Sequence, residues 1–250
     1  MPHKKLIVGL ALLSQLGSPS YGADTSIAVQ YRDKPPYSYT RDTKPVGFLM
    51  ERTQDIFKRA NLTASFEEVP VKRITHNIQM NSFPVCSPGW YKLPERETYA
   101  LFSLPIHEDK AQLVLVGAQA IDRARTARTL KELFANPELK LGKVSGASYG
   151  AELDSMISNA AQTAMDSTVT PLSMAKMIKF KRADYMLIDE EDYSFLNRQG
   201  EVDEADVKPL RYADMPVGLK RDIMCSKNVG ADAMERINAA IRQMALSMKH

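Results

Sequence analysis

Asp189 directly follows the apolar segment 185–188 (YMLI), which reads as a buried strand. A carboxylate at the carboxyl end of a strand lies where α/β proteins bind small ligands, and it can accept a cation or a hydroxyl donor. The acids that follow, Glu190, Glu191 and Asp192, suit a helix N-terminus and are interpreted as solvated. The run lacks the glycine and terminal glutamate of a calcium loop, so no metal site is predicted here.

A second candidate lies in the segment 142–150 (GKVSGASYG), between a predicted strand and a predicted helix. It is not a P-loop, because no G-K-[ST] follows its second glycine. Free backbone N–H groups of Ser148, Tyr149 and Gly150 at such a turn can bind a carboxylate or similar anion. An ordinary helix start with Ser148 as its N-cap explains the same residues, and both interpretations stay open.

A third candidate is the loop predicted over 87–96 (SPGWYKLPER), which carries Trp90, Tyr91 and Arg96. The planar guanidinium of arginine binds carboxylates through two parallel hydrogen bonds. A single arginine after a loop is more often a surface charge, so its neighbours along the chain must decide its role.

Catalytic signatures are missing from the sequence. His76 is predicted on a helix and His107 in a turn, and no H-x-x-x-H, C-x-x-C or G-x-S-x-G motif occurs. We therefore expect a protein that is not an enzyme and that needs no cofactor or metal. A catalytic triad assembled from distant residues stays open.

The elements that must position these residues alternate between strands and helices. Alternation of this kind predicts an α/β fold with mostly parallel strands, here in two small sheets. A proline-rich turn region is predicted over 34–45. Strands are predicted over 26–31, 64–69, 83–86, 112–116, 139–145, 185–188, 207–210 and 222–225, and helices over 48–60, 71–80, 129–135, 151–157, 172–180 and 231–248.

Composition and the N-terminus set the compartment. The 250 residues are 44% hydrophobic and 25% charged, which is ordinary for a globular protein and excludes a disordered chain. Residues 1–22 combine two lysines, a short apolar run and small residues before a cleavage point after Gly22 or Ala23, which predicts a signal peptide and export to the periplasm. Without this segment the net charge of +3 becomes +1, so nucleic acid is not expected as a partner.

Four segments in order resemble one protein family: PERETYALFSLPI (94–106), QLVLVG (112–117), GKVSGASYG (142–150) and ADYMLIDEEDY (183–193). They are similar to bacterial extracellular solute-binding proteins of the amino-acid type (cluster 3), with the type II periplasmic binding fold. The resemblance implies two α/β lobes, joined by two crossover strands, that close on a small ligand. It places the first lobe at 23–106 and 214–250 and the second at 107–213.

The resemblance also implies roles for individual residues. Arg96, six residues before Phe102, would hold a ligand carboxylate, and Asp189, five residues after Asp184, would bind an ammonium group. Arg73, near the start of a helix, would suit a second anionic group, although a solvated helix position is the favoured interpretation.

This chain departs from the family at three ligand-facing positions. Leu93 replaces a usual threonine, and Lys34 and Val71 stand where the family has aromatic residues. Trp90, Tyr91 or Tyr37 would then supply a different stacking surface. The polar ends of an amino-acid site are thus present, whereas its side-chain box differs.

The resemblance implies that the two cysteines pair with each other. It places Cys86 on a strand of the first lobe and Cys225 on the neighbouring returning strand. Cα atoms of paired strands lie close enough for a disulfide, and a periplasmic protein would be oxidised. We therefore predict a Cys86–Cys225 bridge.

The resemblance predicts a monomeric periplasmic protein that captures a small polar, carboxylate-bearing, amino-acid-like solute for an ABC-type transporter. Its partner would be a membrane permease or a sensor. A ligand-sensing or interaction protein without a transporter is the alternative, and a dehydratase-like enzyme on this fold is a third hypothesis.

Overall fold

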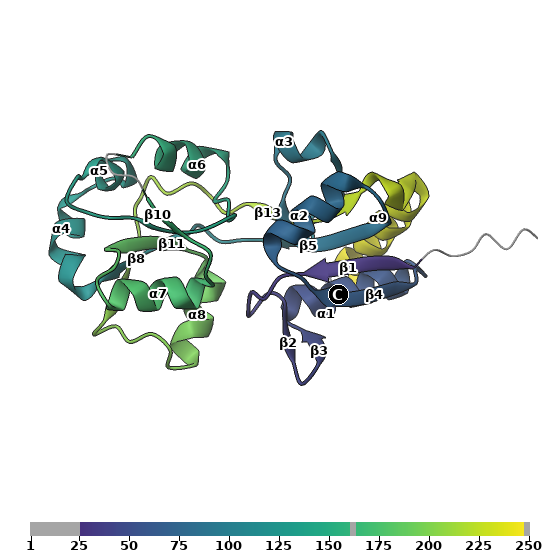
Figure 1. Ribbon diagram of the computed structural model, residues 1–250, viewed down its shortest axis with the longest axis horizontal. Helices are drawn as coiled ribbons and strands as arrows, with labels where there is room; N and C mark the ends of the chain where they lie inside the picture. Colours follow the sequence, from purple (N-terminus) through teal and green to yellow (C-terminus); the bar gives the residue numbers. More distant parts are fainter. Residues whose placement is uncertain (1–25, 161–163, 248–250) are drawn as a thin grey trace, which may run out of the picture.

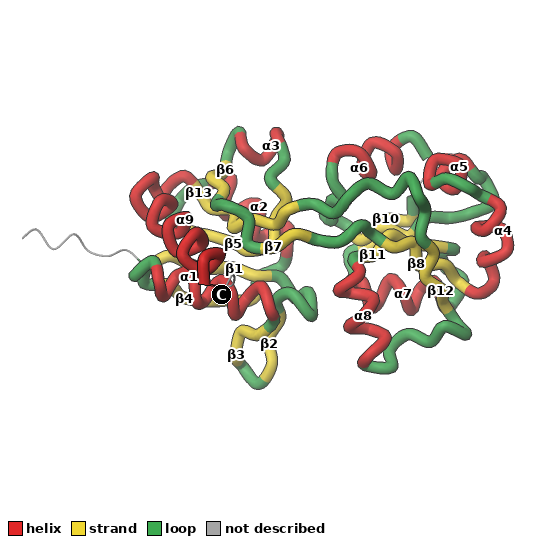
Figure 2. Tube along the Cα trace, turned by 180° about the vertical axis from the view of Figure 1, so that it is seen from behind, coloured by secondary structure: helices red, strands yellow, loops and turns green. Residues whose placement is uncertain are grey.

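The computed structural model describes residues 26–160 and 164–247, so the predicted signal peptide lies outside the described residues. The chain forms two lobes connected by two extended segments (Figures 1 and 2). Within the described ranges, no helix is both long and apolar enough to cross a membrane. The predicted two-lobed α/β fold is confirmed.

The first lobe is built on a sheet with the strand order β4-β1-β5-β13-β6, and β7 also pairs with β13. Strand β1 runs parallel to both β4 and β5, whereas β13 returns antiparallel to β5 and β6. A separate hairpin, β2–β3, projects from this lobe. The strands are β1 (Ile27–Tyr31), β2 (Tyr39–Arg41), β3 (Lys44–Val46), β4 (Ala64–Glu68), β5 (Val85–Tyr91), β6 (Ala100–Phe102), β7 (His107–Glu108) and β13 (Lys220–Ser226).

The long helices α1, α2 and α9 of the first lobe bury apolar residues against this sheet. In α1 the buried positions Leu49, Met50, Ile56 and Phe57 recur at helical spacing. Gly47 precedes the helix with φ +112°, and a Cβ there would lie 2.5 Å from the carbonyl oxygen of Tyr37, so glycine is required. The helices are α1 (Phe48–Arg59), α2 (Val71–Met80), α3 (Pro94–Glu97) and α9 (Gly230–Ser247), with a 3₁₀ turn at Lys227–Val229.

The second lobe contains the three-stranded order β11-β8-β12, which is antiparallel, and the parallel pair β10-β9. A single bridge between Leu141 and Tyr185 connects the two groups. The strands are β8 (Leu113–Gly117), β9 (Gly142–Val144), β10 (Met165–Ser167), β11 (Tyr185–Ile188) and β12 (Val207–Leu210). The helices are α4 (Ile121–Thr126), α5 (Leu130–Ala135), α6 (Ala151–Ser158), α7 (Pro171–Lys179) and α8 (Glu190–Arg198), and a 3₁₀ turn covers Ala118–Ala120.

The two connecting segments run side by side, as Figure 2 shows. The N–H of Asp109 donates to the carbonyl oxygen of Leu219 at 3.0 Å, and β7 pairs with the start of β13. A Cβ on Gly218 would lie 1.7 Å from the carbonyl oxygen of Asp109. Gly218 therefore permits the close approach of the two segments. The lobe boundaries at 106/107 and 213/214 stay a prediction.

The predicted disulfide is confirmed. Cys86 on β5 and Cys225 on β13 face each other in the antiparallel register, with Cα atoms 4.0 Å apart and the sulfur atoms bonded. The bridge joins parts of the chain that are 139 residues apart and ties the returning strand to the first lobe.

Three local predictions were wrong. His107, predicted in a turn, lies on β7. The predicted loop 87–96 is in its first half a continuation of β5 to Tyr91, in which Pro88 and Gly89 are accommodated by a β-bulge. Gly89 has φ +83°, which suits glycine, and the paired register shifts between Asp222 and Ile223. The region 34–45, predicted as a proline-rich turn, also contributes β2 and part of β3.

Candidate functional site

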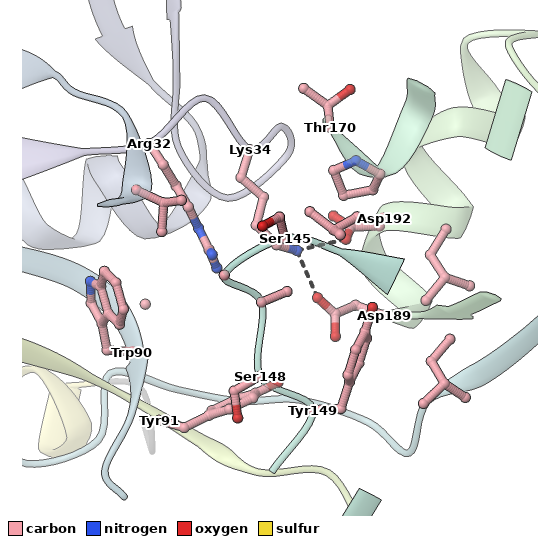
Figure 3. A pocket seen from close by; sticks show the side chains of 18 of the residues that line it. Arg32, Lys34, Trp90, Tyr91, Ser145, Ser148, Tyr149, Thr170, Asp189 and Asp192 are labelled. Carbon is pink, nitrogen blue, oxygen red and sulfur yellow. Dashed lines mark hydrogen bonds and ion pairs between the residues drawn. The ribbon is translucent and has the colours of Figure 1, made fainter. Parts of the chain in front are cut away.

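A cavity of about 280 Å³ lies between the two lobes, at the lower end of the size range of small-molecule sites. The first lobe contributes the residues after β1, the end of β5 and Arg96, and the second contributes the turn after β9, the start of α7 and the end of β11. Figure 3 shows this space with the side chains that line it, ten of which are labelled. Among the predicted ligand-binding residues, the lining includes Trp90, Tyr91, Arg96, Ser148, Tyr149 and Asp189.

Two arginines flank the indole ring of Trp90. The guanidinium carbon of Arg96 lies 5.1 Å from the ring centroid and that of Arg32 lies 5.8 Å from it. The indole N–H is fixed by a 2.8 Å hydrogen bond to the hydroxyl of Ser87. Figure 3 shows the side chain of Arg32 reaching into the cavity beside Trp90.

Neither guanidinium forms an ion pair with any residue that the structure describes. Arg96 donates to the carbonyl oxygen of Tyr91 at 2.9 Å, which orients its side chain. Burial lowers the pKa of Arg32 and that of Arg96 below their usual value, because the charged form loses its hydration. Nearby acidic groups raise both pKa values, but they offset only part of this effect. A ligand carboxylate would supply the missing counter-charge.

Asp189 and Asp192 of the second lobe hold Lys34 of the first. The Lys34 ammonium donates to Asp189 Oδ2 at 2.7 Å and to Asp192 Oδ2 at 2.6 Å, and it lies 4.0 Å from the ring centroid of Tyr37. All three charged side chains are buried. The dashed lines in Figure 3 mark these contacts, which connect the two lobes directly.

Behind this pair, Arg221 at the start of β13 forms a second buried network. Its guanidinium donates to Asp109 Oδ1 at 2.7 Å and to Asp189 Oδ2 at 2.9 Å. It also contacts the hydroxyl of Tyr91 at 3.0 Å, and Tyr91 in turn donates to Asp109 at 2.6 Å. The buried cations Lys34 and Arg221 are thus each shared between two carboxylates.

The two aspartates that bind Lys34 differ in their electrostatics. Burial opposes the ionisation of Asp189, but Lys34 and Arg221 outweigh it and hold the pKa of Asp189 below its usual range. Burial, together with the charge of Asp189, raises the pKa of Asp192 to about 6 in spite of Lys34. The interpretation of Asp192 as a solvated helix residue was therefore wrong.

The turn at 148–150 satisfies its own hydrogen-bonding groups. The N–H of Tyr149 donates to Asp154 Oδ1 at 3.0 Å, and the N–H of Gly150 donates to the hydroxyl of Ser148 at 3.2 Å. The hydroxyl of Ser148 itself donates to the carboxylate of Asp154. The N-cap of α6 is Gly150 and not Ser148. This geometry matches the capped helix start rather than an open anion site.

Three other predicted site residues do not line the cavity. Tyr37 is buried beneath Lys34, and its hydroxyl donates to Glu191 at 3.2 Å. Arg73 is exposed on α2, as its solvated interpretation expects. Gly150 is buried at the start of α6.

Three charged residues of the site were missed by the sequence predictions: Arg32, Asp192 and Arg221. Lys34 was identified as a ligand-facing position, but its acidic partners were not. A usable signal existed for Arg32, which directly follows β1 at the carboxyl end of a parallel strand. The partners of Lys34 lie 155 and 158 residues away, so no local pattern identifies them.

One group near the site could offer ligands to a cation. His107, Asp109 and Glu191 each present one ligand atom within 4.8 Å of the others. The two oxygens of Asp109 already accept hydrogen bonds from Arg221 and Tyr91. This carboxylate therefore balances the charge of Arg221, which leaves little capacity for a metal.

Comparison with known proteins identifies the matching family. Residues 27–249 match the model of the bacterial extracellular solute-binding proteins, family 3. Among curated proteins, no sequence matches this chain.

Several solved structures have a similar fold. The arginine-, lysine-, histidine-binding protein ArtJ from Geobacillus stearothermophilus is 15% identical with a TM-score of 0.71, and 90% of this chain and 91% of that chain are covered. The GluR0 ligand-binding core from Nostoc punctiforme, in complex with L-glutamate, is 17% identical with a TM-score of 0.68. The match covers 89% of this chain and 94% of that chain. The ancestral amino acid-binding protein AncCDT-1, a precursor of cyclohexadienyl dehydratase, is 19% identical with a TM-score of 0.67. The match covers 90% of this chain and 91% of that chain.

Proposed function

Because the chain belongs to the bacterial extracellular solute-binding proteins of family 3, we propose that it captures a small polar solute between its lobes. The solute bears a carboxylate and has about the size of an amino acid. The protein is exported to the periplasm, where it delivers the solute to an ABC-type transporter and performs no reaction on it.

One observation carries the carboxylate assignment: two guanidinium groups face the cavity beside Trp90 without an acidic partner among the described residues. A half-buried arginine without a counter-charge is costly, and a carboxylate bound through two hydrogen bonds removes that cost. Trp90 and Tyr91 form an apolar wall next to these charges. Cavities of this kind combine an apolar lining with a few polar groups that orient the ligand.

Closure of the lobes on the ligand is supported by the composition of the cavity wall. Arg32, Trp90 and Arg96 come from the first lobe, whereas the segments 144–149 and 168–171 come from the second. A solute held by both walls favours the closed arrangement of the lobes, and a transporter or a sensor can recognise that arrangement.

Export is supported by two features. The proposed signal peptide at 1–22 precedes the matched region, and the Cys86–Cys225 bridge suits an oxidising compartment.

The hydrogen bonds of the buried acidic groups support the proposal that the protein performs no reaction. Asp189 accepts hydrogen bonds from Lys34, Arg221 and Gln112, so it is not free to act as a general base. A dehydratase-like reaction that used Asp189 or Asp192 as its base would have to break the ion pairs with Lys34.

Calorimetric titration of the mature protein with a panel of small carboxylates tests this proposal. Arg96→Ala and Arg32→Ala should each weaken binding of the best carboxylate by about tenfold or more, because each removes a charge-assisted contact. Arg73→Ala is the matched control and should bind like the wild type, since Arg73 is exposed and does not line the cavity. Unchanged affinity in both Arg96→Ala and Arg32→Ala, or conversion of the carboxylate to a product, would contradict it.

A further inference from the structure

The ammonium group of Lys34 lies in a cage of the type that recognises organic cations. Two carboxylates, Asp189 and Asp192, approach its Nζ at 2.7 and 2.6 Å, and the face of Tyr37 covers it at 4.0 Å. Paired carboxylates and an aromatic face are the groups with which proteins bind ligand ammonium ions. In this chain the cage is filled by a side chain of the protein itself.

Asp189 already serves two cations of the protein, Lys34 and Arg221. Its Oδ2 also accepts from Arg221 at 2.9 Å, and its Oδ1 accepts from Gln112 at 3.3 Å. The remaining oxygen of Asp192, Oδ1, has no hydrogen-bond partner among the described residues, but it is buried from solvent. A ligand ammonium group would have to displace Lys34 or Arg221, and the displaced cation would lose its partner inside the protein.

The accessible side of the cavity has the opposite character. Arg32 and Arg96 point to it without an ion pair among the described residues. Asp33 is the one other acidic residue of the described lining, and it is exposed at the rim. The surface offered to a ligand therefore carries excess positive charge.

We propose that Lys34 takes the place of a ligand ammonium group, so that the bound solute is a small organic anion with no positively charged amino group. Two unpaired guanidinium groups favour a dicarboxylate over a monocarboxylate. This inference rests on the proposed function and narrows its substrate class: 2-hydroxy acids, 2-oxo acids and simple dicarboxylates are accepted, and α-amino acids of the same skeleton are rejected.

Matched ligand pairs test this selectivity by calorimetry. L-Glutamate is compared with 2-hydroxyglutarate and glutarate, and L-phenylalanine with phenyllactate. We expect the member without the amino group to bind the wild type at least about tenfold more tightly, and glutarate to bind more tightly than phenyllactate.

A double variant tests the role of Lys34 itself. Lys34→Met with Asp192→Asn removes one charge of each sign and frees one position on Asp189. In this variant, the ratio of the Kd of the amino acid to the Kd of its partner without the amino group should be at least about tenfold smaller than in the wild type. Lys44→Met, which changes an exposed lysine of the β2–β3 hairpin, is the control and should keep the wild-type preference.

The outcomes separate the two proposals. If the wild type binds the amino acid as tightly as its partner, or if the double variant keeps the full preference, the role of Lys34 is overturned while the proposed function stands. If no carboxylate of the panel binds the wild type, the proposed function falls, and the inference falls with it.

Discussion

Four cationic side chains surround the cavity, and their partners divide them into two pairs. Lys34 and Arg221 are buried and contact carboxylates within 3 Å. Arg32 and Arg96 lie beside Trp90 with no carboxylate partner among the described residues. At the scale of single residues, the first pair belongs to the internal structure of the site and the second is available to a ligand.

Sequence patterns at this scale identify positions better than partners. Asp189 is predicted at the end of a buried strand, and it does lie in the cavity wall. Asp192, three residues further along, is read as solvated because an acidic run at a helix start usually is. One turn of α8 instead places both carboxylates on Lys34, and only the tertiary structure brings that lysine to them.

The raised pKa of Asp192 predicts a pH dependence of stability. The native pKa of about 6 lies above the ordinary value of about 4, so the native state binds more protons between these values. The contribution of Asp192 to the free energy of unfolding therefore falls as the pH rises from about 4 to about 6.

Urea unfolding of the wild type and of Asp192→Asn at several pH values measures this effect. The free energy of unfolding of the wild type minus that of the variant should decrease as the pH rises from 4 to 6, and it should be constant from pH 7 to 8. A difference that is constant over the whole range would show that Asp192 does not titrate there.

At the scale of elements, most predicted strands and helices are present, because their apolar residues recur with the appropriate period. The end of β5 is where the prediction from the sequence was wrong. The residues Ser87, Pro88 and Gly89 have the composition of a turn, yet the strand continues through them. Pairing with β13 and the bulge at Gly89 override the local preference, and this long-range pairing is not visible in the sequence.

The disulfide between β5 and β13 predicts a large effect on stability. It closes a loop of 139 residues, for which the loop-entropy model gives about 4–5 kcal/mol. Replacing Cys86 and Cys225 together by alanine should lower the free energy of unfolding in urea by up to that amount. A reductant should destabilise the wild type similarly and leave the double variant unaffected, and equal unfolding midpoints of the two proteins would refute the prediction.

The close approach of the connecting segments predicts a position that accepts only glycine. Gly218→Ala would bring a Cβ against the backbone of Asp109, and overpacking of this kind costs about 1–3 kcal/mol. Gly200→Ala is the comparison, because Gly200 has φ +68° but open space around it. Thermal unfolding should show the greater loss for Gly218→Ala. Because alanine at the positive φ of Gly200 carries a backbone cost of its own, a loss for Gly218→Ala that is no greater than that for Gly200→Ala would contradict the predicted clash.

At the scale of the whole molecule, each lobe has its own apolar core, and each buried apolar cluster of the described residues draws on one lobe. Polar groups make the notable contacts between the lobes: Lys34 with Asp189 and Asp192, and Arg221 with Asp189. Alternation of strands and helices predicts this architecture in outline. The relation between the lobes depends on charges that meet across the cavity, which no local sequence pattern reports.

The proposed function requires that a small carboxylate binds between the lobes beside Trp90. Trp90 is the one tryptophan of the chain and is 7% exposed, so its fluorescence reports on this place alone. The most direct measurement is a fluorescence titration with the carboxylate that binds in calorimetry. We predict that the emission of Trp90 changes along the calorimetric isotherm with the same Kd. Calorimetric binding with an unchanged emission would place the ligand elsewhere and contradict this claim.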